Sequence, residues 1–215
     1  MFYQKEMEKI LRFGDVLRGY IFINTTIKKP ILDIPKEKED NYKIYVEIPK
    51  YSAVLTPCCS IGEGKKITLC PLEIVKSDFL KNPNWIKDLT KINREMEPEE
   101  ALPPEKWKDL KEDEQKKRKE EGRGYVELDY FIYDENELFD EYPIKDKNIK
   151  YYMIDFKKAY SIKCDMIKRP EKTKPEDVII KSKILQLTIE ARGELRDKIA
   201  YYYGRVPEED KVLED

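Results

Sequence analysis

Two short apolar segments on either side of a glycine turn constrain the fold of this 215-residue chain more than any other feature. The segments are residues 52–56 (SAVLT) and 66–72 (KITLCPL), and Gly62-Glu63-Gly64 lies between them. Apolar and β-branched runs separated by a glycine-containing loop are typical of a β-hairpin. The sequence therefore predicts an antiparallel strand pair here, with its loop exposed to solvent.

The predicted hairpin gathers three of the four cysteines, because Cys58 and Cys59 follow its first strand and Cys70 lies in its second. If the chain turns over the glycine loop, facing residues have numbers that sum to about 126. Thr56 then faces Cys70, and Cys70 lies diagonally next to Cys58. These thiols can be reduced and buried, joined in a disulfide, or bound to zinc, with Cys164 as a fourth ligand. We favour buried reduced thiols, because adjacent cysteines match no usual zinc spacing and a disulfide fits only a hyperthermophilic host.

The composition excludes several classes of mechanism. Charged residues make up 40% of the chain, yet the formal net charge is only −2, so both signs are mixed over a solvated surface. Many Lys, Glu, Ile and Tyr residues fit a thermophilic host. A pI near 5.7 argues against the global basic field of a dedicated nucleic-acid-binding protein but is compatible with a local basic patch. Because the chain has no His, it has no Ser-His or Cys-His pair, no His metal ligand and no imidazole base.

The start of the chain lacks the apolar segment of a secretory signal. No apolar run reaches the length that is needed to cross a membrane. We therefore expect a cytoplasmic protein without a membrane partner. Thiols are normally reduced in that compartment.

The apolar periodicity predicts one α+β domain over residues 1–215, with a helix at 2–12 and a closing helix after Thr188 that ends at Gly204. Besides the hairpin, strands are expected at 16–23, 42–48, 125–133, 151–156 and 159–162. Residues 77–123 are charged and interrupted by prolines, which predicts a helical insertion between strands. Within it, residues 111–121 contain no apolar side chain and should form a solvated helix or a disordered arm.

Several motifs occur in the order found in one uncharacterised prokaryotic family. They are residues 13–19 (FGDVLRG), 54–61 (VLTPCCSI), 153–156 (MIDF) and 187–205. The chain resembles that family, whose members carry a V-L-(T/S)-Q-x-C-D-(I/L) motif, over most of its length except the insertion. In this motif Cys59 matches the family cysteine, whereas Pro57 stands where Gln is usual and Ser60 stands where Asp is usual.

The first half also resembles, more distantly, the SH3-like barrel of MazF/PemK-type toxins, in which a Gly-Asp strand precedes an Arg-Pro strand and a hairpin. This resemblance implies a curled antiparallel sheet or PemK-like barrel. Residues 49–51 (PKY) replace the toxin Arg-Pro, and the toxin Thr or Ser falls near Lys66. Both ribonuclease residues are therefore missing, and the resemblance implies a barrel kept without the nuclease.

Four polar residues lie in or beside apolar strands. Arg18 could contact an anion, but we expect it to pair with a surface carboxylate. Asp15 is expected to form an Asx-type turn with the backbone that follows it. Asp129 and Asp155 should pair with Lys or Arg, because unpaired buried carboxylates are costly.

We predict a non-catalytic binding or interaction module of a prokaryotic system, of the defence or toxin–antitoxin kind, with a protein partner. Two alternatives stay open. A divergent MazF-like endoribonuclease would use Arg18, Thr56 or Lys66. A cysteine-based metal-binding or redox-sensing protein would use its four cysteines, with Cys59 as the sensing thiol and zinc as the one cofactor considered.

Overall fold

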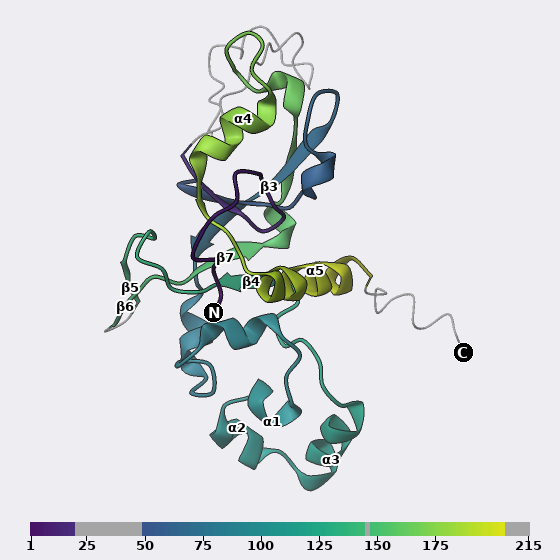
Figure 1. Ribbon diagram of the computed structural model, residues 1–215. Coiled ribbons are helices and arrows are strands. Elements are labelled where there is room, and N and C mark those ends of the chain that lie inside the picture. The colour runs from purple at the N-terminus through teal and green to yellow at the C-terminus, as the bar shows by residue number, and fades with distance from the viewer. Residues whose placement is uncertain (20–48, 145–146, 205–215) are drawn as a thin grey trace, which may run out of the picture.

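The computed structural model describes residues 1–19, 49–144 and 147–204, and in them the chain forms an α+β fold around a mostly antiparallel sheet. Seven strands make up this sheet in the order β4-β7-β3-β2-β1-β9, with β8 paired to β3 beside β7 (Figure 1). The two end strands, β4 and β9, do not pair with each other in the described part of the chain, so the sheet there is open. The α+β prediction is confirmed.

The elements have the following bounds. The strands of the sheet are β1 (Val16–Arg18), β2 (Tyr51–Val54), β3 (Lys66–Ile74), β4 (Tyr130–Tyr133), β7 (Tyr152–Asp155), β8 (Tyr160–Lys163) and β9 (Lys183–Leu185). A separate hairpin contains β5 (Tyr142–Ile144) and β6 (Lys147–Ile149). The helices are α1 (Pro98–Ala101), α2 (Pro104–Asp109), α3 (Glu112–Glu121), α4 (Pro175–Ile179) and α5 (Ile189–Gly204).

Along one edge of the central strand β3, the ladder of paired residues is interrupted. Its first half pairs with β8, where Leu69 faces Tyr160, and its second half pairs with β7, where Leu72 faces Ile154. The segment that joins β7 to β8 therefore has extra residues between these pairs, and they form the 3-10 helix η5 (Phe156–Lys158). Pro71 lies in β3 opposite this break, a position that suits a residue without an N–H to donate.

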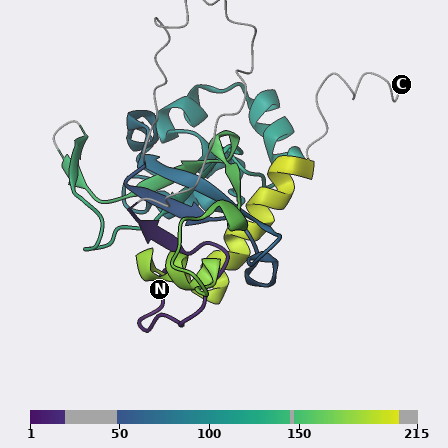
Figure 2. The same cartoon turned by 90° about the horizontal axis from the view of Figure 1, so that it is seen from above.

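Outside β8 and the start of β3, most of the sheet is buried on both faces, which explains why its other strands are mainly apolar rather than alternating. On one face Ala53, Cys70 and Leu72 pack with Ala191 and Leu195 of α5. Figure 2 shows α5 running along that side of the sheet. The other face carries two further clusters. One forms around β4 and β7, and the other forms around β1, β2 and the first half of β3.

A buried ion pair joins the N-terminal segment to β1 and β9. Lys183 Nζ lies 2.9 Å from Asp15 Oδ2, and the two side chains are 3% and 0% exposed. The same ammonium donates to Gln186 Oε1 at 2.7 Å and to the carbonyl oxygens of Ile10 at 2.8 Å and Glu8 at 3.0 Å. Burial raises the pKa of Asp15, although Lys183 and the Arg12 N–H, 2.7 Å from Oδ2, act in the opposite direction. The Asp15 side chain thus binds Lys183 and the preceding N–H of Arg12, and not the backbone that follows it, as was expected.

The base of the 77–123 insertion belongs to the core. Asn93, at the end of the 3-10 helix η4 (Leu89–Asn93), donates to the carbonyl of Ile132 and accepts from its N–H, both at 2.7 Å. This amide therefore takes the place of a further strand along β4. Lys198 of α5 is fully buried and donates to the carbonyl of Ile92. Burial lowers the pKa of Lys198 to about 7.

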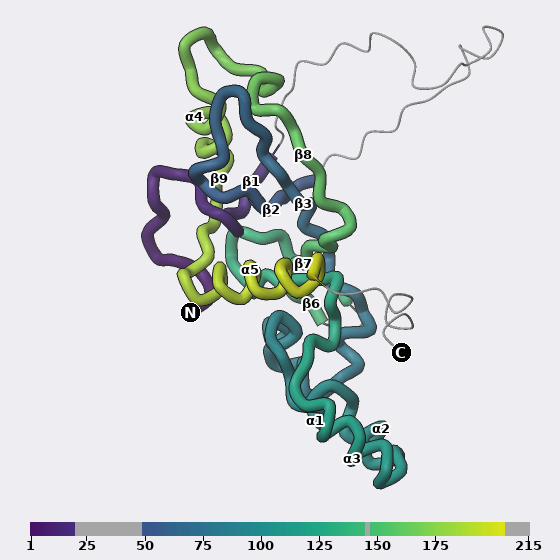
Figure 3. Tube along the Cα trace, turned by 90° about the vertical axis from the view of Figure 1, so that its right-hand side faces the viewer, coloured from purple at the N-terminus to yellow at the C-terminus, as the bar shows by residue number. Residues whose placement is uncertain are grey.

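The rest of the insertion projects away from the sheet. Helices α1, α2 and α3 lie at the opposite end of the molecule from the loop between β8 and α4 (Figure 3). Helix α3 has no buried residue and carries ion pairs such as Arg118–Glu114, at 3.2 Å. Of the two alternatives expected for residues 111–121, a solvated helix and a disordered arm, the structure shows the solvated helix. Among the described helices, none combines the length and apolarity that a membrane span needs.

Some expected elements differ from the structure. Residues 2–12 do not form a helix, because Tyr3 makes a β-bridge to Leu187 and the carbonyls that follow bind Lys183. The strand expected at 125–133 begins only at Tyr130. The strand expected at 42–48, and the end of the one at 16–23, lie outside the described residues. The β5–β6 hairpin and α4 were not predicted. Thr188 does cap α5, since its Oγ1 accepts from the N–H of Ala191 at 3.3 Å.

The Lys183→Ala variant should lose about 3–5 kcal/mol of unfolding free energy, because it leaves the carboxylate of Asp15 buried without its partner. Urea denaturation followed by circular dichroism measures this loss. Lys181→Ala removes an exposed lysine nearby and should change stability by less than about 0.5 kcal/mol. Equal effects of the two substitutions would contradict the role given to the ion pair.

Candidate functional site

The predicted hairpin is present, but its register differs from the expected one. Ala53 rather than Thr56 faces Cys70, and Val54 faces Leu69. The shift arises because Cys58–Ser60 form a 3-10 helix, η2, which lengthens the first side of the loop. Thr56 instead accepts a hydrogen bond from the N–H of Thr68 through Oγ1, at 2.6 Å.

The four cysteines fall into two pairs with different surroundings. Cys58 and Cys59 are exposed on η2, whereas Cys70 and Cys164 are buried, and all four are free thiols. Cys70 Sγ lies 3.1 Å from the carbonyl of Asp155, and burial raises its pKa to about 12. Cys70 and Cys164 belong to different core clusters. The described residues contain no group of three or more Cys, Asp or Glu side chains placed to hold a metal ion.

The three residues considered for a nuclease do not converge. Arg18 donates to the hydroxyl of Tyr51, at 3.2 Å, and to the carbonyl of Leu138. The expected ion pair of Arg18 with a surface carboxylate is not found among the described residues, and the nearby carboxylate of Asp140 pairs with Lys50. Arg18 faces Tyr51 of β2, and the next residue of β2, Ser52, faces Pro71 near the far end of β3. Lys66 begins β3, and it therefore lies roughly 20 Å away along the strand direction. Thr56 lies nearer to Lys66, because it is hydrogen-bonded to Thr68, two residues further along β3.

Asp129 and Asp155 are satisfied as structural groups. Asp129 forms an ion pair with Lys157, which confirms that expectation. Asp155 accepts from the N–H of Lys157 at 3.0 Å and so caps η5. Its partner is thus a backbone group of the same turn.

A polar surface runs along the paired strands β3 and β8, which we call the cationic ribbon (Lys66, Thr68, Ser161 and Lys163). Lys66 faces Lys163 directly, and Thr68 faces Ser161 with 2.8 Å between their hydroxyl oxygens. Neither lysine has an ion-pair partner in the described part of the chain. Like charges directly opposite each other on neighbouring strands are destabilising. The ribbon therefore lowers stability while it concentrates positive charge.

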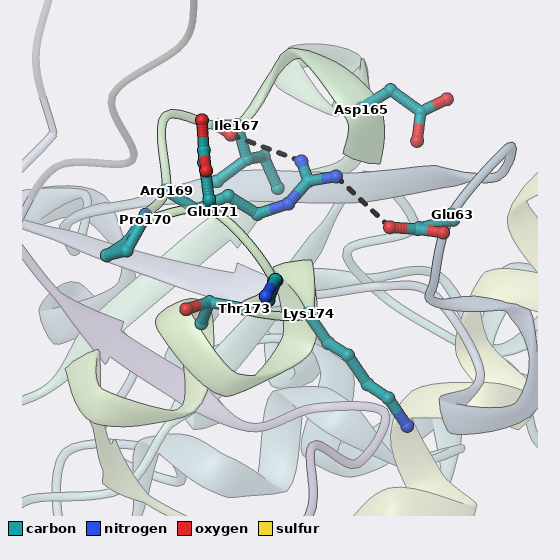
Figure 4. Close-up of a pocket in the computed structure, with 9 residues that line it drawn as sticks. Glu63, Asp165, Ile167, Arg169, Pro170, Glu171, Thr173 and Lys174 are labelled. Atoms are coloured by element: carbon teal, nitrogen blue, oxygen red, sulfur yellow. Dashed lines mark hydrogen bonds and ion pairs between the residues drawn. The ribbon is translucent and has the colours of Figure 1, made fainter.

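The loop after β8 is held against the tip of the hairpin and carries further cations. Asp165 accepts from the N–H of Gly64 at 3.0 Å, and Arg169 lies 3.4 Å from Glu63. Arg169 also donates to the carbonyls of Cys164 and Ile167, at 3.3 and 3.4 Å. These contacts border a pocket of about 330 Å³. In Figure 4 Arg169 reaches toward Glu63, while the Lys174 side chain points away from that pair.

Two of the three carboxylates at this pocket are therefore used to fix the loop. Glu63 and Asp165 hold Arg169 and the Gly64 N–H, which leaves Glu171 as the remaining acidic group among the residues that line the pocket. The exposed lysines Lys172 and Lys174 have no ion-pair partner among the described residues. Lys172 has φ 65°, a strained backbone conformation for a lysine. The local excess of positive charge exists although the whole chain is slightly acidic.

Sequence reasoning considered Lys66 but missed its partner and the loop lysines. Residues 163–174 (KCDMIKRPEKTK) contain five cations and two carboxylates, a local bias that could have been noticed. What the sequence could not show is that Lys163 faces Lys66, since that depends on the β3–β8 register.

We expect Cys58 and Cys59 to react readily with a thiol reagent such as Ellman's reagent, because both are exposed. Cys70 and Cys164 should react only after unfolding, because both are buried. Counting the released thionitrobenzoate with and without denaturant tests this. The Cys58→Ser/Cys59→Ser double variant should show no rapid phase in the native state. Rapid reaction of all four native thiols, or of none, would contradict the described placement.

The chain was compared with protein-family models, with curated proteins and with solved structures. No family model matches, and no curated protein or solved structure matches significantly. Among the described residues, the opposed lysines of the cationic ribbon are the feature that points most directly to a function.

Proposed function

We propose that the protein is a non-catalytic binding module that holds the phosphate backbone of a nucleic-acid strand on its cationic ribbon. The facing pair Lys66 and Lys163 supports this most directly. Two ammonium groups without carboxylate partners gain most from an anion that lies between them. A basic patch confined to one end of the sheet suits an otherwise acidic protein.

The chemistry of the ribbon suits a chain of phosphates better than a single anion. The hydroxyls of Thr68 and Ser161 lie next to the lysines along the same two strands. Hydroxyl, lysine and backbone donors supply most contacts to phosphate oxygens in nucleic-acid complexes. The ribbon offers two cations, Lys66 and Lys163, that have no ion-pair partner among the described residues. If both contact phosphates, the logarithm of the affinity for a single strand should fall with the logarithm of salt concentration with a slope of about −1.4.

The proposal keeps the module non-catalytic, because Arg18 is bound to Tyr51 and Leu138 on another part of the sheet. A bound RNA should consequently stay intact. The proposal also retains a PemK-like origin for the sheet and a prokaryotic, cytoplasmic setting. A protein partner, where one exists, would find a separate surface on the projecting helices α1–α3.

The Lys66→Glu variant tests the proposal through two opposite effects. It replaces a repulsive cross-strand pair by an attractive one, so the unfolding free energy should rise by about 0.2–1 kcal/mol. The same change should weaken binding of labelled single-stranded RNA and DNA, measured by fluorescence anisotropy at several salt concentrations. Its salt dependence should be less steep, because one phosphate contact becomes a repulsion.

The control for charge alone is Lys117→Glu on α3, an exposed lysine in a helix that has no buried residue. It makes the same change in net charge far from the ribbon and should leave the affinity nearly unchanged. If the two variants weaken binding equally, or if the wild type binds neither RNA nor DNA at low salt, the proposal is wrong. Cleavage of the RNA by the wild type would instead favour the endoribonuclease.

A further inference from the structure

The C-terminal end of α5 carries an exposed aromatic side chain next to the start of β8. Tyr203 is 70% exposed, and its ring lies edge-on to that of Tyr202, with 4.9 Å between centroids. Tyr202 in turn packs on Phe156 at 5.3 Å. Phe156 begins η5, the turn that leads directly into β8. Tyr203 is therefore held beside the sheet by a stack of rings.

The same face of the sheet carries both Tyr203 and the cationic ribbon. Cys70 packs in the core cluster that also contains Phe156 and the buried side of α5, with Tyr202 against it. Side chains two residues apart in a strand point to the same face. Thr68 and Lys66 therefore lie on the α5 face, beyond the part of the sheet that the helix covers. Figure 3 shows β8 rising from beside the C-terminal half of α5.

The distance between the two features suits an extended strand of nucleic acid. Lys163 is at the far end of β8 from η5, and the four residues of this strand span roughly 13 Å. The hydroxyl of Ser161 lies between the two ends. An exposed ring, a hydroxyl pair and an ammonium pair thus follow one another along a single face.

We propose that Tyr203 is a stacking site for an unpaired base of the strand whose phosphates lie on the cationic ribbon. This inference rests on the function proposed above and adds a second, chemically different subsite to it. A tyrosine ring stacks on a base whose face is open, and a base inside a duplex does not offer that face. The protein should therefore prefer single strands to duplexes of the same sequence.

The experiment compares two polyanions, one with bases and one without. Fluorescence anisotropy gives the affinity for labelled oligothymidylate, and competition against it gives the affinity for inorganic polyphosphate. Tyr203→Ala should weaken oligothymidylate binding by roughly 5- to 150-fold, the usual effect of removing one stacked aromatic ring. It should leave polyphosphate binding unchanged, whereas Tyr203→Phe should retain both affinities.

The matched aromatic control is Tyr201→Ala. Tyr201 is 49% exposed and packs on Tyr125, at 5.1 Å, rather than on the stack beside η5. The Tyr201→Ala variant should leave the affinities for oligothymidylate and polyphosphate unchanged. Thermal unfolding shows whether each variant is folded.

The outcomes separate the two proposals. If Tyr203→Ala binds oligothymidylate as the wild type does, or if Tyr201→Ala weakens binding equally, the stacking site is wrong while the phosphate-binding function stands. A loss for polyphosphate as large as that for oligothymidylate would also overturn stacking. If the wild type binds neither polyanion, the proposed function itself fails.

Discussion

The ion pair between Asp15 and Lys183 is the interaction on which the rest of the structure depends. It lies inside the protein, where the ammonium also satisfies two carbonyls of the N-terminal segment and the amide of Gln186. A buried charge without such partners would be strongly unfavourable. The pair therefore fixes β9 beside β1, and β9 is followed within a few residues by α5. The face that α5 covers, and the part of the sheet it leaves open, follow from this arrangement.

The core and the surface share the charged residues in different ways. Lys183 and Lys198 are buried and donate to carbonyl oxygens, and burial lowers the pKa of Lys198. They connect elements that are distant in sequence, since Lys198 ties α5 to the base of the insertion. In the part of the chain that the structure describes, the lysines of the cationic ribbon make no such contacts, and their mutual repulsion is expected to reduce the stability of the strands that carry them. Residues that break a local rule without structural compensation are expected at functional sites.

The sequence predicted what depends on local patterns and missed what depends on distant partners. The hairpin around Gly62 and the cap at Thr188 follow from residues close in the chain, and both are present. The register of that hairpin was wrong because η2 takes up residues that an ideal turn would leave in the strand. The helix expected at residues 2–12 was wrong because its backbone groups have partners in β9 and the segment after it. Likewise, no local pattern shows that Lys66 faces Lys163.

The central claim is that phosphate binding and base stacking occur on one face, along β3, β8 and the end of α5. An amide-resolved NMR titration with single-stranded oligothymidylate tests it most directly. The account predicts that the largest chemical-shift changes occur at Lys66, Thr68, Ser161, Lys163 and Tyr203, with little change in α1–α3. Changes concentrated instead around Arg18 and Leu138, or on the projecting helices, would contradict it.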